Sequence, residues 1–337
     1  MHKIRVFFSR VRTMSFRRMV LYAKLARAQR KRPLLYILLD MCICSVRYGV
    51  GYLDYYSFGF IHQNAAARRT YMTMADNVAL VRRLNDPDYK YIFDDKAEFL
   101  AKYPEYVKRD WLDLRKADLE EFTAFAAKYP VFFAKETDNF GGLGVKRIDT
   151  DGMDLSALYS DLYEKKMYCL EQPVIQHEQM NALCPSSVNT IRMVTVLRDG
   201  KAELMYSIIR MGNGSGAVDN ISSGGMYSPV NEEGVLTAPA FCDKTGMYYD
   251  THPATGTPLV GYRIPMFDQA VAAVKQAALI VPQVRYVGWD VAIAPDGPVF
   301  IEGNTFPSYD MVQNYGHLGA EKTGIKPRFE KLAGIKF

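Results

Sequence analysis

The chain of 337 residues is longer than one typical domain and can bury a sizeable core in two or three packed units. Its apolar content of 49% and charged content of 23% are ordinary for a globular protein. The five cysteines include no CxxC pair and the five histidines show no HExxH spacing, which argues against a disulfide framework or a zinc site. Unpaired cysteines of this kind are typical of a reducing compartment, so we expect a cytoplasmic protein.

Positive charge is concentrated at the start of the chain. Eleven Lys and Arg residues precede the first acidic residue, Asp40, although the whole chain carries a net charge of only +5. Apolar residues are interleaved with them, so we expect residues 1–32 to form a basic amphipathic arm. This arm either lies on an anionic membrane surface, at the inner face of the membrane, or on an acidic partner. The alternatives are a solvated basic face and an arm that packs on the fold. The apolar run at residues 33–46 is shorter than the roughly 20 residues that span a bilayer. No nucleic-acid-binding motif follows, so no nucleic acid partner is predicted.

Helices are predicted in the first part of the chain and a mixed pattern after it. Apolar spacing at residues 34–48 and 71–81 indicates helices, and residues 49–60 are expected to form a packed aromatic connector. From about residue 91 helices alternate with strands. Asp118 and Glu121 form a capping-box pair at the start of a helix that runs to Lys128.

A strand at residues 131–135 leads into a glycine-rich loop at residues 139–146. Its glycines let backbone N–H groups approach phosphates, although many hairpins contain such loops. Further strands are predicted at residues 167–175, 189–197 and 202–211. A long glycine-rich loop over residues 212–225 and a helix over residues 266–280 precede the last hairpin.

The last predicted hairpin carries an acidic cluster. A three-residue loop at 295–297, with a left-handed Gly297, places Asp290 opposite Glu302 on the neighbouring strand. Side chains alternate along a strand, so Asn304 is expected on the same face. Two carboxylates and an amide oxygen suit Mg²⁺, which usually binds through one or two carboxylates plus substrate phosphates. The alternative is a solvated polar face on an edge hairpin.

A series of short motifs occurs in order between residues 34 and 315. They are Arg47-Tyr-Gly49, Asp94-Asp-Lys96, Ala134-Lys135 with its glycine loop, Asn189-Thr-Ile-Arg192, Gly224-Gly225, His252-Pro253, and Gly288-Trp-Asp290 through Glu302-Gly-Asn304. Together they resemble the ATP-grasp superfamily, and more narrowly the ATP-grasp proteins associated with sugar transfer and surface-polysaccharide gene clusters. The resemblance implies an α+β fold, the ATP-grasp fold, in which two α+β subdomains clasp ATP, with a helical N-terminal region.

This resemblance divides the chain into four parts and assigns its site residues. The parts are a basic arm (1–32), a helical region (33–90), a small subdomain with a glycine-rich lid (91–165) and a C-terminal subdomain with the Mg²⁺ site (166–325). The residues assigned to the phosphates and the lid are Lys96, Lys135, Gly141, Gly142 and Gly144. Those assigned to adenine and ribose are Glu171 and Val174, in a hinge at residues 170–174, and Glu178. The Mg²⁺ ligands are Asp290, Glu302 and Asn304, and the catalytic residue at the transferred phosphoryl group is Arg192.

The chain departs from the resemblance in two places. Its N-terminal region is helical where many ATP-grasp ligases have a Rossmann-like domain, so the substrates of the peptide-ligase branches are not carried over. The arginine often found two residues before the metal-binding aspartate is replaced by Gly288, so its role is assigned to Arg192. Structural alternatives stay open for three residues: a surface charge for Lys135, a solvated acid for Glu178 and a salt-bridged strand residue for Arg192.

The implied function is an ADP-forming, ATP- and Mg²⁺-dependent ligase that joins a carboxylate to an amine through an acyl phosphate. Its expected partners are small-molecule or glycan-linked carboxylates and amines, in surface-polysaccharide or related glycoconjugate modification. Two alternatives stay open. One is an ATP-grasp kinase that phosphorylates a sugar or lipid-linked hydroxyl, and the other is a nucleotide-binding protein without turnover.

Overall fold

The computed structural model of the chain describes residues 15–137, 144–214 and 224–337. They form two compact units. One unit contains the described residues of Met1–Leu84 and Phe306–Phe337, and the other contains those of Asn85–Thr305. The finer division of the chain at residues 32, 90 and 165 remains a prediction.

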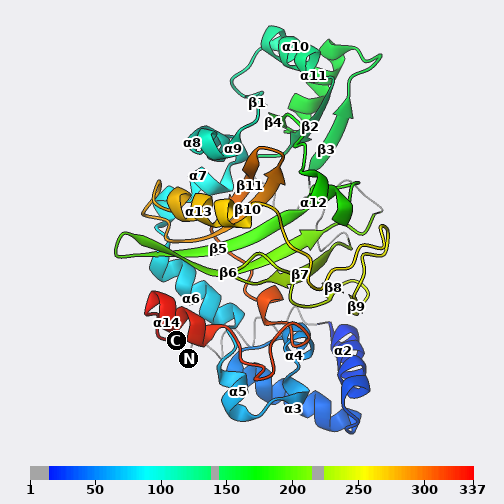
Figure 1. Ribbon diagram of the computed structural model, residues 1–337, viewed down its shortest axis with the longest axis vertical. Helices are drawn as coiled ribbons and strands as arrows, with labels where there is room; N and C mark the ends of the chain where they lie inside the picture. The colour runs from blue at the N-terminus through cyan, green and yellow to red at the C-terminus, as the bar shows by residue number, and fades with distance from the viewer. Residues whose placement is uncertain (1–14, 138–143, 215–223) are drawn as a thin grey trace. The chain divides into compact units, whose positions relative to one another are not determined.

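The first unit is built from helices (Figure 1). They are α2 (Phe16–Gln29), α3 (Leu34–Tyr48), α4 (Tyr52–Ser57), η1 (Phe60–His62), α5 (Ala65–Arg69), α6 (Met74–Leu84), η4 (Met311–Gln313) and α14 (Lys326–Ala333). The helices expected from the apolar spacing of residues 34–48 and 71–81 are therefore confirmed, the second beginning at Met74. Its start is fixed by Thr73, whose backbone N–H and hydroxyl both donate to Asp76 Oδ2 at 2.9 Å.

The described part of the basic arm is folded into this unit. Helix α2 begins after Ser15, whose hydroxyl accepts a hydrogen bond from the backbone N–H of Arg18 at 3.3 Å. The helix contacts α3 and α4, and Tyr22 stacks on Tyr52 with ring centroids 5.6 Å apart. None of the described helices is long and apolar enough to cross a membrane.

Aromatic side chains fill the centre of the first unit, as expected for the connector at residues 49–60. Phe58 and Phe60 are fully buried, and their rings lie 5.1 and 5.3 Å from that of Tyr71. Nearby, Asp40 of α3 pairs with Arg68 Nη2 at 2.6 Å and accepts a hydrogen bond from the Tyr55 hydroxyl at 2.7 Å. The only acidic residue of α3 is therefore neutralised within the unit.

The second unit contains two antiparallel sheets. The smaller sheet has the order β1-β4-β2-β3 and consists of β1 (Trp111–Asp113), β2 (Val131–Lys135), β3 (Val145–Asp149) and β4 (Cys169–Glu171). Its core includes side chains of α10 (Leu119–Lys128) and α11 (Leu155–Glu164). The predicted capping box is present, because Asp118 and Glu121 each accept a hydrogen bond from the other's backbone N–H.

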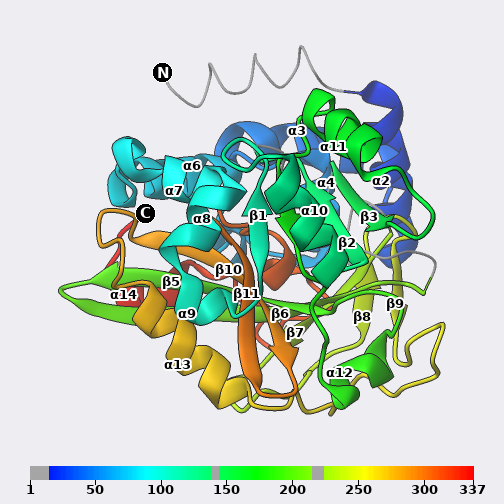
Figure 2. The same ribbon diagram turned by 90° about the horizontal axis from the view of Figure 1, so that it is seen from above.

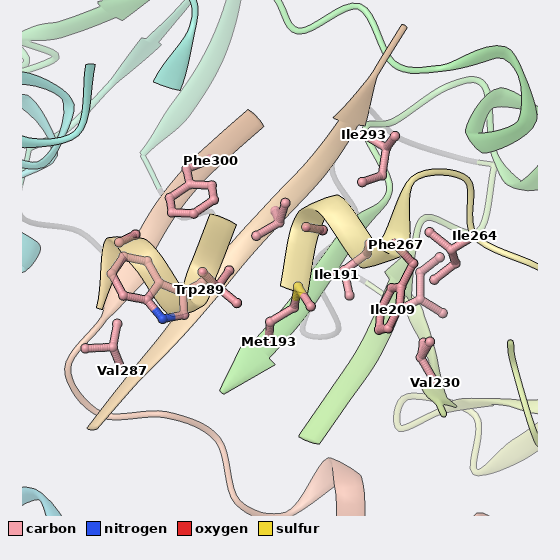
Figure 3. Close-up of a cluster of buried hydrophobic side chains, with 14 of the residues drawn as sticks. Ile191, Met193, Ile209, Val230, Ile264, Phe267, Val287, Trp289, Ile293 and Phe300 are labelled. Carbon is pink, nitrogen blue, oxygen red and sulfur yellow. The ribbon is translucent and has the colours of Figure 1, made fainter. Parts of the chain in front are cut away.

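The larger sheet has the order β11-β10-β5-β6-β7-β8-β9. Its strands are β5 (Thr190–Arg198), β6 (Lys201–Met211), β7 (Met226–Val230), β8 (Ala240–Cys242), β9 (Met247–Tyr249), β10 (Tyr286–Ala294) and β11 (Gly297–Asn304). Helix α13 (Phe267–Ala277) packs on β5, β6, β10 and β11, and Ile191, Met193 and Trp289 belong to the core that they form (Figure 3). Because side chains alternate, the residues next to these in each strand face the other side of the sheet.

Short helices complete the second unit: η2 (Pro87–Tyr89), α7 (Tyr91–Asp94), α8 (Lys96–Lys102), α9 (Pro104–Val107) and α12 (Glu178–Leu183). Helices α7, α8 and α9 contact β11 (Figure 2). The expected α+β class with a helical N-terminal region is therefore confirmed.

Candidate active site

The β10–β11 hairpin places Asp290 directly opposite Glu302, as the sequence predicted, but by a different route. The turn has two residues instead of the expected three, because Ala294 pairs with Gly297, whose φ is +131°. Strand β11 compensates for the shorter turn with one extra residue, Ile301. This residue forms a β-bulge between Phe300, the partner of Val291, and Glu302, the partner of Asp290. Bulges are common near active sites because they re-aim side chains.

This bulge decides which side of the sheet Glu302 faces. Phe300 pairs with Val291 and lies in the core beneath α13. In an unbroken strand Glu302, two residues later, would face that core too. With Ile301 as an extra residue, Glu302 instead shares the face of Asp290. Strand β11 thus supplies both a core aromatic and a site carboxylate.

Two arginines hold Asp290, one from the neighbouring strand β5 and one from β6, the strand beyond it. Arg192 of β5 pairs with it through Nε and Nη2, the latter 3.0 Å from Oδ2. Arg210 Nη2 of β6 lies 2.7 Å from the same oxygen. Burial alone raises the pKa of Asp290, but the charges of Arg192 and Arg210 outweigh burial and lower the pKa to about 2. Arg192 is therefore salt-bridged, and its partner is the predicted metal ligand.

The pKa of Glu302 is shifted in the opposite direction from that of Asp290. Burial and the neighbouring negative charge of Asp290 raise its pKa above the usual value. Asn304, which pairs with Gly288 across the hairpin, donates through Nδ2 to Glu302 Oε1 at 3.4 Å. The three predicted metal ligands therefore lie together on one face.

The donor set of this face fits Mg²⁺. Asp290 Oδ2 accepts from both arginines, whereas Oδ1 accepts from Arg192 alone of the two and keeps a second lone pair for a cation. A dication would also relieve the repulsion that raises the pKa of Glu302. Among the described residues no cluster of three or more His, Cys, Asp and Glu side chains is found that could bind a metal. Two carboxylates suffice for Mg²⁺ because substrate phosphates and water complete its shell.

A second charged cluster lies at the end of β2. Lys135 Nζ is 2.6 Å from Glu171 Oε1, and Arg109 Nη2 is 2.5 Å from Oε2 of the same residue. Burial raises the pKa of Glu171, but the charges of Arg109 and Lys135 prevail and lower the pKa to about 2. Lys135 is therefore a largely buried ion-pair partner and not a strand-end surface charge.

Arg109 is a residue of this cluster that the sequence does not indicate. Its Nη1 donates to the carbonyl of Phe300 at 2.6 Å and its Nη2 to that of Ile301 at 3.4 Å. The same guanidinium holds Glu171, so it joins the small sheet to the β11 bulge next to Glu302. No local pattern indicates this contact, because its partners are 62 to 192 residues away in the chain.

Lys96 connects the two clusters electrostatically. It is the first residue of α8, and its backbone N–H donates to the carbonyl of Thr137 at 3.1 Å. Burial lowers the pKa of its ammonium group, while the nearby charges of Glu302 and Glu171 raise it and that of Lys135 lowers it. The structure thus brings Lys96, Lys135 and Glu171 into one neighbourhood with Glu302.

The remaining predicted residues lie at the edges of this neighbourhood. Gly141 and Gly142 fall outside the described residues, and Gly144 precedes β3 with φ +72°. Val174 packs on Ala292, Ala294 and Val299 of the large sheet, in the connection that follows β4. Glu178 is exposed at the start of α12, and the described residues show no hydrogen bond or ion pair joining it to the rest of the site.

Comparisons with known proteins give a family and several similar structures. No curated protein matches the chain. The ATP-grasp ligase PsnB complexed with minimal precursor is 13% identical with a TM-score of 0.42, over 74% of this chain and 63% of that one. D-cycloserine synthetase DcsG is 14% identical with a TM-score of 0.44, over 76% of this chain and 78% of that one.

A third similar structure is D-alanyl-alanine synthetase A from Vibrio cholerae, 9% identical with a TM-score of 0.40, over 73% of this chain and 62% of that one. The chain thus spans less than two thirds of the length of PsnB and of this synthetase. The sequence model of the family described as sugar-transfer associated ATP-grasp matches residues 131–331, which is more than half of the chain. The protein therefore belongs to the sugar-transfer associated ATP-grasp family.

Proposed function

We propose that the protein is an ATP- and Mg²⁺-dependent ligase that joins a carboxylate to an amine and releases ADP and phosphate. The observation that carries the proposal is the pair formed by the buried Asp290 and the half-buried Glu302, which face each other across two strands, with Asp290 held by arginines of β5 and β6. Membership of an ATP-grasp family supports the general class of enzyme. The lysines near Glu302 support binding of a polyphosphate.

In this proposal the nucleotide lies between the charged clusters. The phosphate-binding and lid residues are Lys96, Lys135, Gly141, Gly142 and Gly144. The adenine and ribose residues are Glu171, Val174 and Glu178. The residues that would hold Mg²⁺ are Asp290, Glu302 and Asn304. When bound, Mg²⁺ supplies positive charge that neutralises and orients the phosphate oxygens.

The reaction has two steps in this proposal. A carboxylate oxygen of the first substrate attacks the γ-phosphorus of ATP, and the bond from that phosphorus to ADP breaks. The amine then attacks the acyl carbon, loses one proton, and phosphate leaves. Arg192 lies beside the transferred phosphoryl group and stabilises the charge that develops there.

The proposed setting is surface-polysaccharide or related glycoconjugate modification, with a small-molecule or glycan-linked carboxylate and an amine as substrates. The family description supports a link to sugar transfer. The proposed location is the cytoplasm, at the inner face of the membrane, with residues 1–32 as the contact to anionic lipid. The charge of this segment supports the contact, since eleven basic residues precede Asp40.

Hydroxylamine trapping tests the ligase reaction. An acyl phosphate reacts with hydroxylamine, so incubation with ATP, Mg²⁺ and candidate amino acids or sugar acids should give a hydroxamate with equal amounts of ADP and phosphate. Glu302→Gln is the matched control and should give none of the three. If ATP is consumed with a sugar or lipid acceptor, without phosphate release and without any hydroxamate, the protein is a kinase and the proposal is wrong.

A further inference from the structure

Helix α3 is apolar on two opposite sides. Its buried side is formed by Ile37, Met41 and Cys44. Its other side carries large apolar residues at helical spacing, here called the α3 apolar face: Leu35 (69% exposed), Leu39 (56%), Ile43 (56%) and Val46 (53%). A helix that is apolar all round is normally buried all round, so an exposed face of this kind indicates a binding surface.

Positive charge borders the α3 apolar face. Residues 15–53 contain eight Lys and Arg residues and one acidic residue, Asp40, which is paired with Arg68. Before the helix, residues 30–32 are all basic and exposed, and Arg47 is exposed next to Val46. The Arg32 guanidinium lies 5.9 Å from the ring centroid of Tyr36, which is itself exposed. The apolar face is therefore bracketed at both ends by exposed cations.

We propose that the α3 apolar face inserts into the interfacial region of an anionic lipid bilayer, with the flanking cations at the headgroups. The proposal deepens the membrane contact proposed above by adding an apolar element in α3 to the charge of residues 1–32. Apolar insertion and headgroup attraction are each weak alone, and stable interfacial binding requires both. With 15 residues, α3 lies in the plane of the interface and does not span it.

Charge selects a bilayer over a second copy of this chain. A twofold contact between two α3 apolar faces would bring two positively charged borders together, which is unfavourable. Anionic headgroups are attracted to the same border, while the acyl chains cover the apolar side chains. The surface thus matches a negatively charged, apolar partner.

Vesicle binding by the full chain tests the proposal. The variant Leu39→Glu/Ile43→Glu should bind vesicles of mixed phosphatidylglycerol and phosphatidylcholine at least about tenfold more weakly than the wild type. The matched control is Val260→Glu/Leu279→Glu, which makes the same change of charge at two exposed apolar residues of the second unit. It should bind within about twofold of the wild type. Circular dichroism must show that both variants are folded.

Cys42 provides a direct readout of insertion. It is exposed on α3 between Leu39 and Ile43, whereas the other four cysteines are buried. An environment-sensitive fluorophore attached there should shift to the blue with anionic vesicles and show little change with pure phosphatidylcholine. Binding without this shift would overturn insertion and leave residues 1–32 as the contact.

Two further outcomes would overturn the proposal. The α3 variant could bind vesicles as tightly as its control, or the wild type could form a dimer in solution that the α3 variant does not, making the face an interface between copies. Hydroxamate formation is measured separately, without vesicles, for wild type and variant. If no hydroxamate forms in that assay, the proposed ligase function is contradicted. The vesicle-binding result still tests the membrane contact of α3, because it does not depend on the ligase reaction.

Discussion

Replacing Arg109 with Met should destabilise the second unit, because one guanidinium joins a buried carboxylate to the β11 bulge. It contacts Glu171 at 2.5 Å and the carbonyl of Phe300 at 2.6 Å. The pKa of Glu171 falls from 4.5 to about 2 on folding, a difference worth about 3 kcal/mol at neutral pH. Arg109 is the larger of the two charges that offset the burial of Glu171, and the cost of burial remains in the variant, so the variant should lose at least half of this effect. Three lost hydrogen bonds, to the carbonyls of Val107, Phe300 and Ile301, add about 1 kcal/mol each, giving a loss of at least about 4 kcal/mol.

The pH dependence has a definite sign. A carboxyl group whose pKa is lowered on folding stabilises the protein above its unfolded pKa, and that stability is lost as the pH falls through the folded value. For Glu171 the window runs from about 4.5 down to about 2. The difference between wild type and Arg109→Met should therefore be largest near neutral pH and shrink in acid, leaving the part due to the backbone hydrogen bonds.

Urea unfolding followed by tryptophan fluorescence measures this loss selectively. The two tryptophans of the chain, Trp111 and Trp289, both lie in the second unit, so the signal reports on the unit that contains Arg109. The matched control is Arg198→Met, which removes an exposed ion pair with Asp199 at 3.1 Å and should cost less than about 1 kcal/mol. Equal midpoints for Arg109→Met and Arg198→Met would refute the reasoning.

Three further changes test the neighbouring residues. Lys135→Met should weaken ATP binding by about tenfold or more in calorimetry and also lower the urea midpoint, since Glu171 loses a partner at 2.6 Å; unchanged affinity would remove Lys135 from the nucleotide site. Gly144→Ala should cost about 1 kcal/mol in the same urea assay, because φ is +72° and a Cβ would lie 2.7 Å from Glu136 Cδ; no change would mean that the turn relaxes freely. Arg192→Lys keeps the charge but loses the two-pronged contact with Asp290, so kcat should fall about tenfold or more with little change in KM for ATP; a change in KM alone would assign Arg192 to binding.

The sequence predicts the local elements of this site well, because local patterns determine them. The alternation of β10 and β11 and the turn residues between them are sufficient to pair Asp290 with Glu302. The bulge at Ile301 is not predictable in the same way, because a two-residue turn plus one bulge gives the same pairing as a three-residue turn. Only the packing of Phe300 beneath α13 distinguishes the two.

The contacts that the sequence misses are those between distant residues. Arg210 is 80 residues from Asp290, and Arg109 is 62 residues from Glu171. Neither arginine belongs to a local motif, so charge type alone gives no reason to choose it among the 42 Lys and Arg residues. For Lys135 the strand is predicted correctly, but its buried partner Glu171 lies on β4, which pairs with β2 only in the folded sheet.

The central claim is that Asp290 and Glu302 form the Mg²⁺ end of a nucleotide site, and Glu302→Gln tests it most directly. Glutamine keeps the shape of the side chain and removes the repulsion that raises the pKa of Glu302, so the urea midpoint should not fall. Steady-state ADP formation at limiting Mg²⁺ should nevertheless drop by about a hundredfold or more, because a dication site loses one of its two charges. Near-normal ADP formation by folded Glu302→Gln at limiting Mg²⁺ would contradict the account.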